Sequence, residues 1–219
     1  LEVMRIMLDQ FLPKSVKTFS TPARLCWVEP TTSMVVVCTS SRTLQPFDFS
    51  DGKISKLAKF DLVLGRGQVL ELEEVAVLPL YDDTYCVHAD SLNGRVSLRN
   101  ISNPQKGTPQ HDIVIDVTDE DSVVGKLRLS KVDNLLVVHC LQRKVSVLFD
   151  IHHRDRGTVP CVAGPWPISA AGTDGYATPL KDTYLFFNGP WIMDKEGGAL
   201  FQLKVDMRYI LQDFLTRTS

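Results

Sequence analysis

Residues 132–151 read VDNLLVVHCLQRKVSVLFDI, which is two apolar runs joined by a short polar segment at Gln142 and Arg143. Both runs contain β-branched residues in the period-2 alternation of a strand. The first run, around Val137, is apolar on both faces, which is typical of a strand at the centre of a sheet. This stretch therefore predicts a β-hairpin whose first strand is central.

The same layout recurs along the chain. Strand patterns begin at Met34, Thr84, Asn134 and Tyr184, at intervals of 50 residues, and a turn and a second strand follow each of them. The expected hairpins cover residues 33–49, 84–101, 134–151 and 183–205. Further strands are expected over residues 23–29, 68–78, 113–117 and 124–130, which gives units of about four strands. A period of roughly 40 to 50 residues with four strands per unit is typical of propeller blades.

The predicted fold class is therefore all-β, with a β-propeller over residues 1–206 of which about four blades are visible. A β-sandwich also has short strands at regular spacing. We favour the propeller because the whole two-strand layout recurs at a fixed interval. The pattern allows a four-bladed ring, but the chain begins at Leu1 rather than at a methionine, so we expect earlier blades upstream and a larger propeller.

Two segments depart from the repeat. Residues 152–182 are rich in proline and glycine, which predicts a long excursion between blades, either a disordered insertion or a binding loop. Within it Trp166, held between two prolines, is a candidate partner contact. Over residues 207–217 the apolar residues change to helical spacing. Residues 207–219 are therefore expected to begin a helical region.

Composition excludes several classes of partner. The 24 lysines and arginines nearly balance the 26 aspartates and glutamates, so no overall field attracts nucleic acid or anionic lipid. No apolar stretch approaches the length of about 18 residues that a membrane span requires, so membrane contact is expected only peripherally or through a partner. The five cysteines are widely spaced and odd in number, which indicates free thiols and a reducing compartment.

A search for chemistry finds no catalytic, cofactor-binding or metal-ligating residues. His139 and Cys140 are adjacent, so in a strand they point to opposite faces and cannot bind one metal; we interpret them as core residues. His153, Arg154 and Asp155 match the kinase catalytic-loop tripeptide, but the asparagine required five residues after the aspartate is Pro160. The residues alone therefore predict an all-β interaction scaffold and no particular activity.

The acidic residues Glu71, Glu73 and Glu74 are expected to lie in a strand, with Glu71 and Glu73 on one face. Such a face is either an exposed blade edge or a contact for a basic partner. Glu71 and Glu73 are therefore the remaining candidate partner contacts.

Several strings resemble one known family. They are residues 43–49 (TLQPFDF), 54–60 (ISKLAKF), 132–139 (VDNLLVVH) and 147–151 (VLFDI). They resemble the L-Q-P-F-x-F, S-K-L-P-K-F, V-D-N-L-V-V-V-H and V-I-F-D-I segments of the Bulli or colon-cancer-associated Mic family. A looser similarity covers residues 198–205 and 213–215. The chain departs from the family at Ala58, where the family has proline, at Cys140, where it has a second histidine, and throughout residues 152–182.

This resemblance implies a propeller followed by a helical region, in an accessory subunit of the metazoan Mon-Ccz complex. The complex contains two longin-domain subunits and activates the Rab GTPase of late endosomes. A member would be a non-catalytic scaffold without cofactors, cytoplasmic and peripheral on late endosomes and lysosomes, that supports endosome maturation, lysosomal trafficking and autophagy. The alternative is a propeller enzyme whose active site lies in the central channel.

Overall fold

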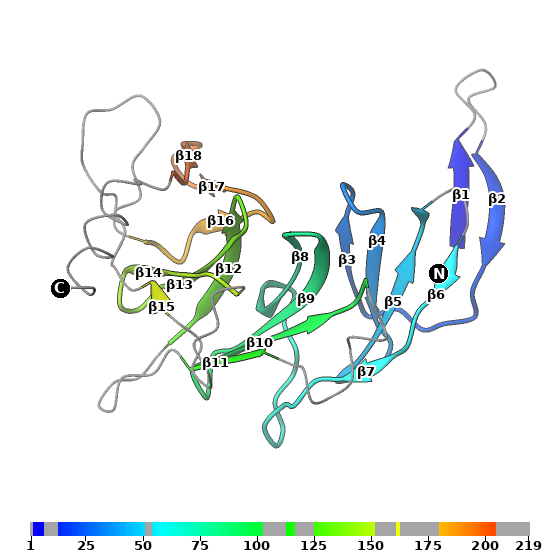
Figure 1. Ribbon diagram of the computed structural model, residues 1–219, viewed down its shortest axis with the longest axis horizontal. Helices are drawn as coiled ribbons and strands as arrows, with labels where there is room; N and C mark the ends of the chain where they lie inside the picture. The colour runs from blue at the N-terminus through cyan, green and yellow to red at the C-terminus, as the bar shows by residue number, and fades with distance from the viewer. Residues whose placement is uncertain are drawn as a thin grey trace.

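The computed structural model describes residues 2–6, 13–50, 54–102, 113–116, 125–151, 161–162 and 180–204, and the account below is limited to these residues. Every strand pairing among them is antiparallel. The regular structure in this part of the chain is almost entirely β, with one short 3-10 helix (Figure 1). The prediction of an all-β chain is confirmed for this part.

The strands form one two-stranded hairpin and four larger sheets, numbered here in chain order. The hairpin pairs β1 (Glu2–Ile6) with β2 (Pro13–Thr18). The first sheet contains β3 (Leu25–Glu29), β4 (Met34–Cys38), β5 (Thr43–Asp48), β6 (Ser55–Lys56) and β7 (Phe60–Asp61). The second contains β8 (Val75–Leu80), β9 (Asp83–Asp90), β10 (Arg95–Asn100) and β11 (Ile113–Asp116). The third contains β12 (Leu127–Val132), β13 (Leu135–Cys140), β14 (Val145–Phe149) and β15 (Cys161–Val162). The fourth contains β16 (Tyr184–Phe186), β17 (Trp191–Asp194) and β18 (Leu200–Gln202).

Three of the four predicted hairpins are confirmed. They are the pairs β4 with β5, β9 with β10, and β13 with β14. In the stretch that decides the fold, Val138 lies opposite Val147 and His139 opposite Ser146. Strand β13 is central, between β12 and β14, as its two apolar faces predict.

The fourth predicted hairpin is wrong in its number of strands, because residues 183–205 contain three short strands rather than two. The prediction placed one turn at residues 194–198, but a second turn separates β16 from β17, where the Phe187 N–H bonds the Trp191 carbonyl at 3.2 Å. Gly189 and Pro190 occupy this turn, and proline cannot donate to a strand ladder. Tyr184 therefore begins the edge strand of its sheet, whereas Met34, at the corresponding point of the repeat, begins a central one.

The predicted strand over residues 68–78 is also shorter than expected. Strand β8 begins only at Val75, and the 3-10 helix η2 (Leu72–Glu74) precedes it. The Glu74 carboxylate turns back to accept a hydrogen bond from the Glu71 N–H at 3.0 Å, which closes a tight turn instead of extending the strand. Glu71, Glu73 and Glu74 therefore do not lie in a strand, which corrects the prediction.

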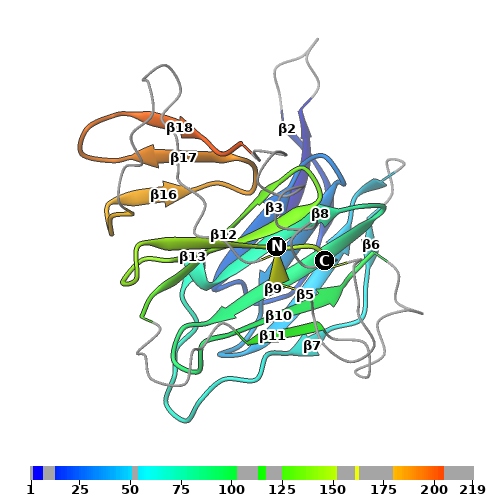
Figure 2. The same ribbon diagram turned by 60° about the vertical axis from the view of Figure 1, so that its left-hand side comes forward.

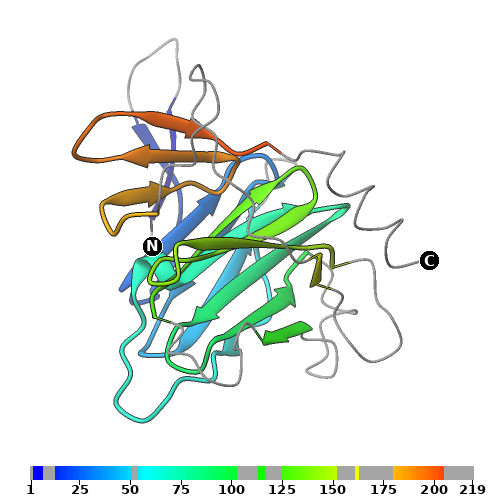
Figure 3. The same cartoon turned by 90° about the vertical axis from the view of Figure 1, so that its left-hand side faces the viewer.

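The four sheets follow one another in chain order (Figure 1). Neighbouring sheets meet through their leading strands, which are the first strands of each sheet: β3 contacts β8, β8 contacts β12, and β12 contacts β16. Figures 2 and 3 show the second and third sheets lying across each other, with the fourth sheet beyond the third. The sheets are thus stacked face to face along the chain, and the described residues do not close into a ring.

Each interface between sheets has its own apolar core. Between the first and second sheets, Trp27, Val36 and Leu44 pack with Val75 and Val77. A second cluster joins the opposite face of the second sheet to the third sheet, and it includes Leu78, Val87, Leu98, Leu136 and Val138. Alternate residues of β8 therefore face the first sheet and the third sheet. Both faces of the strand are buried, which is why its sequence is apolar throughout.

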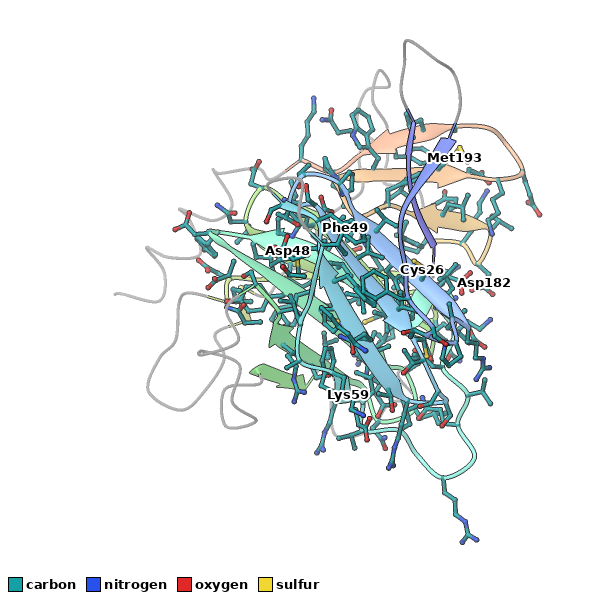
Figure 4. The ribbon with its side chains drawn as sticks, turned by 90° about the vertical axis from the view of Figure 1, so that its right-hand side faces the viewer. Cys26, Asp48, Phe49, Lys59, Asp182 and Met193 are labelled. Carbon is teal, nitrogen blue, oxygen red and sulfur yellow. The ribbon has the colours of Figure 1, made fainter. Side chains whose placement is uncertain are left out.

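The two ends of the stack expose apolar side chains. In the first sheet, Val28 is 55% exposed, and Cys26 is exposed in register with Val37 (Figure 4). In the fourth sheet, Trp191 is 39% exposed and Leu200 is 52% exposed. Their neighbours Ile192 and Phe201 are buried in a cluster on the opposite face. The outer face of the fourth sheet therefore lacks the apolar cover that the inner sheets have. The outer face of the first sheet is open only in part, because Val37 and Phe47 on that face are fully buried.

Two predicted features lie outside the described residues: the helix over residues 207–217 and the excursion over residues 152–182, apart from β15 and the residues from Leu180 onward. In the part of the chain that the structure covers, we find no helix of sufficient length and apolarity to cross a membrane. Cys26, Cys38, Cys86 and Cys140 are free thiols, as the sequence predicts for them.

Candidate functional site

His139 is fully buried in the third sheet, and both of its ring nitrogens are hydrogen-bonded. Its Nε2 lies 2.7 Å from the Ser130 hydroxyl and its Nδ1 lies 2.7 Å from the Ser146 hydroxyl. The Phe186 ring of the fourth sheet packs on the imidazole with 4.5 Å between centroids. Burial lowers the pKa of His139 to about 3. A neutral imidazole has one donor and one acceptor, so the two serines satisfy it completely.

Cys140 lies on the opposite face of β13, in the cluster between the second and third sheets. The interpretation of His139 and Cys140 as packed core residues is therefore confirmed. Within the described ranges, no three histidine, cysteine, aspartate or glutamate side chains come together in a way that could hold a metal ion.

Glu71 and Glu73, the predicted partner contacts, are exposed on the turn that leads into β8. This turn is fixed to the first sheet, because the Trp27 indole N–H donates to the Leu72 carbonyl at 2.8 Å. Between the two glutamates Leu72 is also exposed, so the turn presents two carboxylates around one apolar side chain. Trp166, the third predicted contact, lies outside the described residues. The structure thus brings Glu71 and Glu73 together on one fixed, exposed turn.

A pocket of about 260 Å³ lies between the β7 region of the first sheet and one face of the second sheet. His88 lines this pocket and is only 3% exposed, yet its Nε2 has no hydrogen-bond partner among the residues that the structure describes. A buried polar atom without a partner is costly, so such atoms in native proteins call for an explanation. Burial lowers the pKa of His88, and nearby Asp90 partly opposes this effect.

The polar lining of the pocket comes from two paired strands. Asp90 lies opposite Arg95, His88 opposite Ser97, and Cys86 opposite Arg99, so all six side chains share one face of the second sheet. On the far wall the Phe60 ring lies under the Arg99 guanidinium, with the Arg99 Cζ 4.5 Å from the ring centroid. The pocket therefore combines arginine, serine and imidazole groups with an apolar wall.

Both carboxylates in the pocket are already engaged. Asp61 accepts a hydrogen bond from the Thr43 hydroxyl at 2.7 Å and pairs with Arg42 at 3.6 Å. Asp90 accepts hydrogen bonds from the Leu92 and Asn93 N–H groups and from the Asn93 side-chain amide, at 3.1, 3.2 and 2.6 Å. Asp90 therefore shapes the turn between β9 and β10, and its acceptor capacity is largely used there.

The sequence prediction missed this pocket. A signal was present, because Arg95, Ser97 and Arg99 place polar side chains at alternate positions of a strand whose other face is buried. That alternation also fits an ordinary solvent-facing strand. The sequence around residues 95–99 does not show that residues 60–63 pack over the polar face of this strand.

No family model matches the chain. A mouse (Mus musculus) protein named Regulator of MON1-CCZ1 complex is 28% identical over 213 residues, which cover 83% of this chain and 32% of the mouse protein. The human (Homo sapiens) protein of the same name is 28% identical over 139 residues, which cover 57% of this chain and 20% of the human protein. The chain thus spans about a third or less of the length of these curated relatives. The chain is similar to the proteins named Regulator of MON1-CCZ1 complex, and this supports, at a modest level of identity, the family resemblance read from its sequence.

Proposed function

We propose that this chain is part of a non-catalytic regulatory subunit that binds the MON1-CCZ1 complex. The observation that carries the proposal is the match to two proteins that bear this name, one of them over most of the chain. The stacked sheets support a scaffold role, because they offer extended faces and a fixed acidic turn at Glu71 and Glu73 for contact with partners. The names of the relatives describe a regulator, which favours a regulatory over a catalytic role.

The four sheets act, in this proposal, as consecutive blades of a larger β-propeller. Contact between the leading strands and face-to-face burial of neighbouring sheets are the packing expected of blades around an axis. The apolar side chains at the two ends of the stack, such as Val28 and Trp191, would be covered by further blades. A structure of a longer chain in which those faces stay open to solvent would contradict this part of the proposal.

The subunit would act with the two longin-domain proteins of the complex in activating the late-endosomal Rab GTPase. Its place would be in the cytoplasm, peripheral on late endosomes and lysosomes, in support of endosome maturation, lysosomal trafficking and autophagy. A scaffold without a group to insert into a GTPase site changes where a complex acts rather than its rate of chemistry.

Nucleotide-release assays test this role. The MON1-CCZ1 pair and its Rab are measured with and without the subunit, first in solution and then on liposomes that carry the Rab. We expect a similar release rate in solution and a difference only on membranes, together with impaired Rab recruitment in cells that lack the protein. A large stimulation in solution that depends on residues of these sheets would show direct participation in exchange. Failure to co-purify with the MON1-CCZ1 pair would overturn the proposal altogether.

A further inference from the structure

We propose that the His88 pocket is a binding site for a small oxyanion, a carboxylate or a phosphate. The pocket is formed where the first and second sheets pack together, it is partly open to solvent, and its lining includes His88, Ser97, Arg95 and Arg99. This assignment is independent of the proposed regulatory role, because it rests on the geometry of the pocket alone.

The first argument is the unpartnered nitrogen. His88 lies opposite Ser97 in the centre of two paired strands, and its Nε2 is shielded from water without a hydrogen-bond partner in the described part of the chain. By contrast His139, the buried histidine of the third sheet, has a serine on each nitrogen. The buried Nε2 of His88 therefore lacks one hydrogen bond that a ligand in the adjoining pocket can supply.

The second argument is that the pocket contains more donors than acceptors. Each guanidinium has five N–H groups in a planar fork, so Arg95 and Arg99 can each donate to a ligand while keeping another contact. The Ser97 hydroxyl adds a further donor, and the His88 Nε2 adds another in the tautomer that carries the proton on this nitrogen. The oxygens of Asp61 and Asp90 are bonded to groups of the protein itself. A ligand that offers several acceptor atoms therefore complements the pocket best.

The two arginines and two aspartates that line the pocket balance in formal charge, so the preference for an oxyanion rests on hydrogen-bond donors rather than on net charge. Size restricts the ligand further, because 260 Å³ is slightly below the range of about 300–1,000 Å³ for small-molecule pockets. A compact group fits this volume, whereas a dinucleotide or a large cofactor does not.

Imidazole NMR of the intact purified protein tests the proposal at pH 7. Inorganic phosphate and succinate are titrated separately, in a buffer without other oxyanions, and the His88 Nε2 resonance is followed. We expect a saturable shift of His88 with at least one of the two anions, while the His139 resonance stays unchanged as an internal control. A shift with phosphate alone or succinate alone identifies the source of the oxyanion, and either supports the proposal.

Two variants separate specific binding from general attraction of anions. Arg95→Gln removes one donor fork at an exposed position, and we expect it to weaken binding by roughly tenfold or more. Arg24→Gln, which removes the same charge at an exposed position that does not line the pocket, should leave the affinity unchanged. No His88 shift with either anion at about 10 mM, or equal weakening by both variants, would overturn the proposal.

Discussion

The Tyr81 hydroxyl donates a hydrogen bond to the Asp150 carboxylate, and this contact joins the turn between β8 and β9 to the end of β14. The backbone N–H of the same tyrosine donates to the Asn134 side-chain oxygen at 2.7 Å. Tyr81 has a positive φ of 56°, so the turn holds it in a conformation that non-glycine residues seldom adopt. Burial, together with Asp150, raises the pKa of Tyr81 to about 12. One residue of the second sheet thus makes two polar contacts with the third sheet.

Removal of the Tyr81 hydroxyl should loosen this connection. Tyr81→Phe keeps the ring and removes the donor to Asp150, so we expect the free energy of unfolding to fall by about 1 kcal/mol. Tyr184→Phe is the matched control, because the Tyr184 hydroxyl is buried with no hydrogen-bond partner within the described ranges, and its removal should be neutral or slightly stabilising. Urea unfolding of both variants measures the difference. Equal loss in the two would mean that the contact with Asp150 adds no stability.

The burial of neutral His139 should make the free energy of unfolding depend on pH. Its pKa is about 3 in the folded chain and about 6.5 when unfolded, so between these values only the unfolded state takes up the proton. The stability contributed by neutral His139 is therefore complete above pH 6.5 and declines as the pH falls toward 3, by at most about 1.4 kcal/mol per pH unit. His139→Gln should be less stable at pH 7 but should lose less stability on acidification. Parallel profiles for the two proteins, measured by urea unfolding, would contradict the assignment.

The protein should bind no zinc through His139 or Cys140. Both His139 nitrogens are occupied by serine hydroxyls, and Cys140 lies on the other face of the strand. Elemental analysis of the purified protein should therefore find no stoichiometric zinc that depends on these residues. Zinc that disappears on substitution of either residue would show that the core interpretation is wrong.

Substitution of Gly125 by alanine should lower stability more than the same substitution at another glycine of similar backbone conformation. Both Gly125 and Gly67 have positive φ, 69° and 79°, so alanine at either position costs about 1 kcal/mol in backbone strain. An added Cβ at Gly125 would also overlap the Gln142 side chain, whose own Cβ would be 2.6 Å away, whereas the space around Gly67 is open. We expect Gly125→Ala to be the more destabilising by at least a further 1 kcal/mol in thermal or urea unfolding. Equal losses would mean that the Gln142 side chain moves aside freely.

The exposed apolar face of the fourth sheet should promote self-association of the isolated 219-residue chain. Trp191→Gln combined with Leu200→Ser should reduce association in light scattering, because both side chains lie on the uncovered face of the fourth sheet. Val63→Ser is a control, since Val63 is highly exposed but lies in the loop after β7. If the chain stays monomeric and unfolds cooperatively at high temperature without further sheets, the end faces need no cover.

The sequence by itself determined the strands and hairpins, because these depend on short-range features. Alternation of apolar residues around Val137 and a polar turn at Gln142 are enough to specify a hairpin, and the period of two alone places His139 and Cys140 on opposite faces. The recurrence of this layout also indicated several similar sheets in series.

Only the tertiary structure decided where some strands begin and which contacts and pockets lie between neighbouring sheets. The strand predicted from Gln68 starts at Val75 because Glu74 bonds back to Glu71 and Trp27 of another sheet bonds the Leu72 carbonyl. The contact of Tyr81 with Asp150 spans 69 positions, and the pocket at His88 exists only because the β7 region packs over the second sheet. Such contacts depend on how separate sheets pack against each other, and no local pattern of residue types encodes that packing.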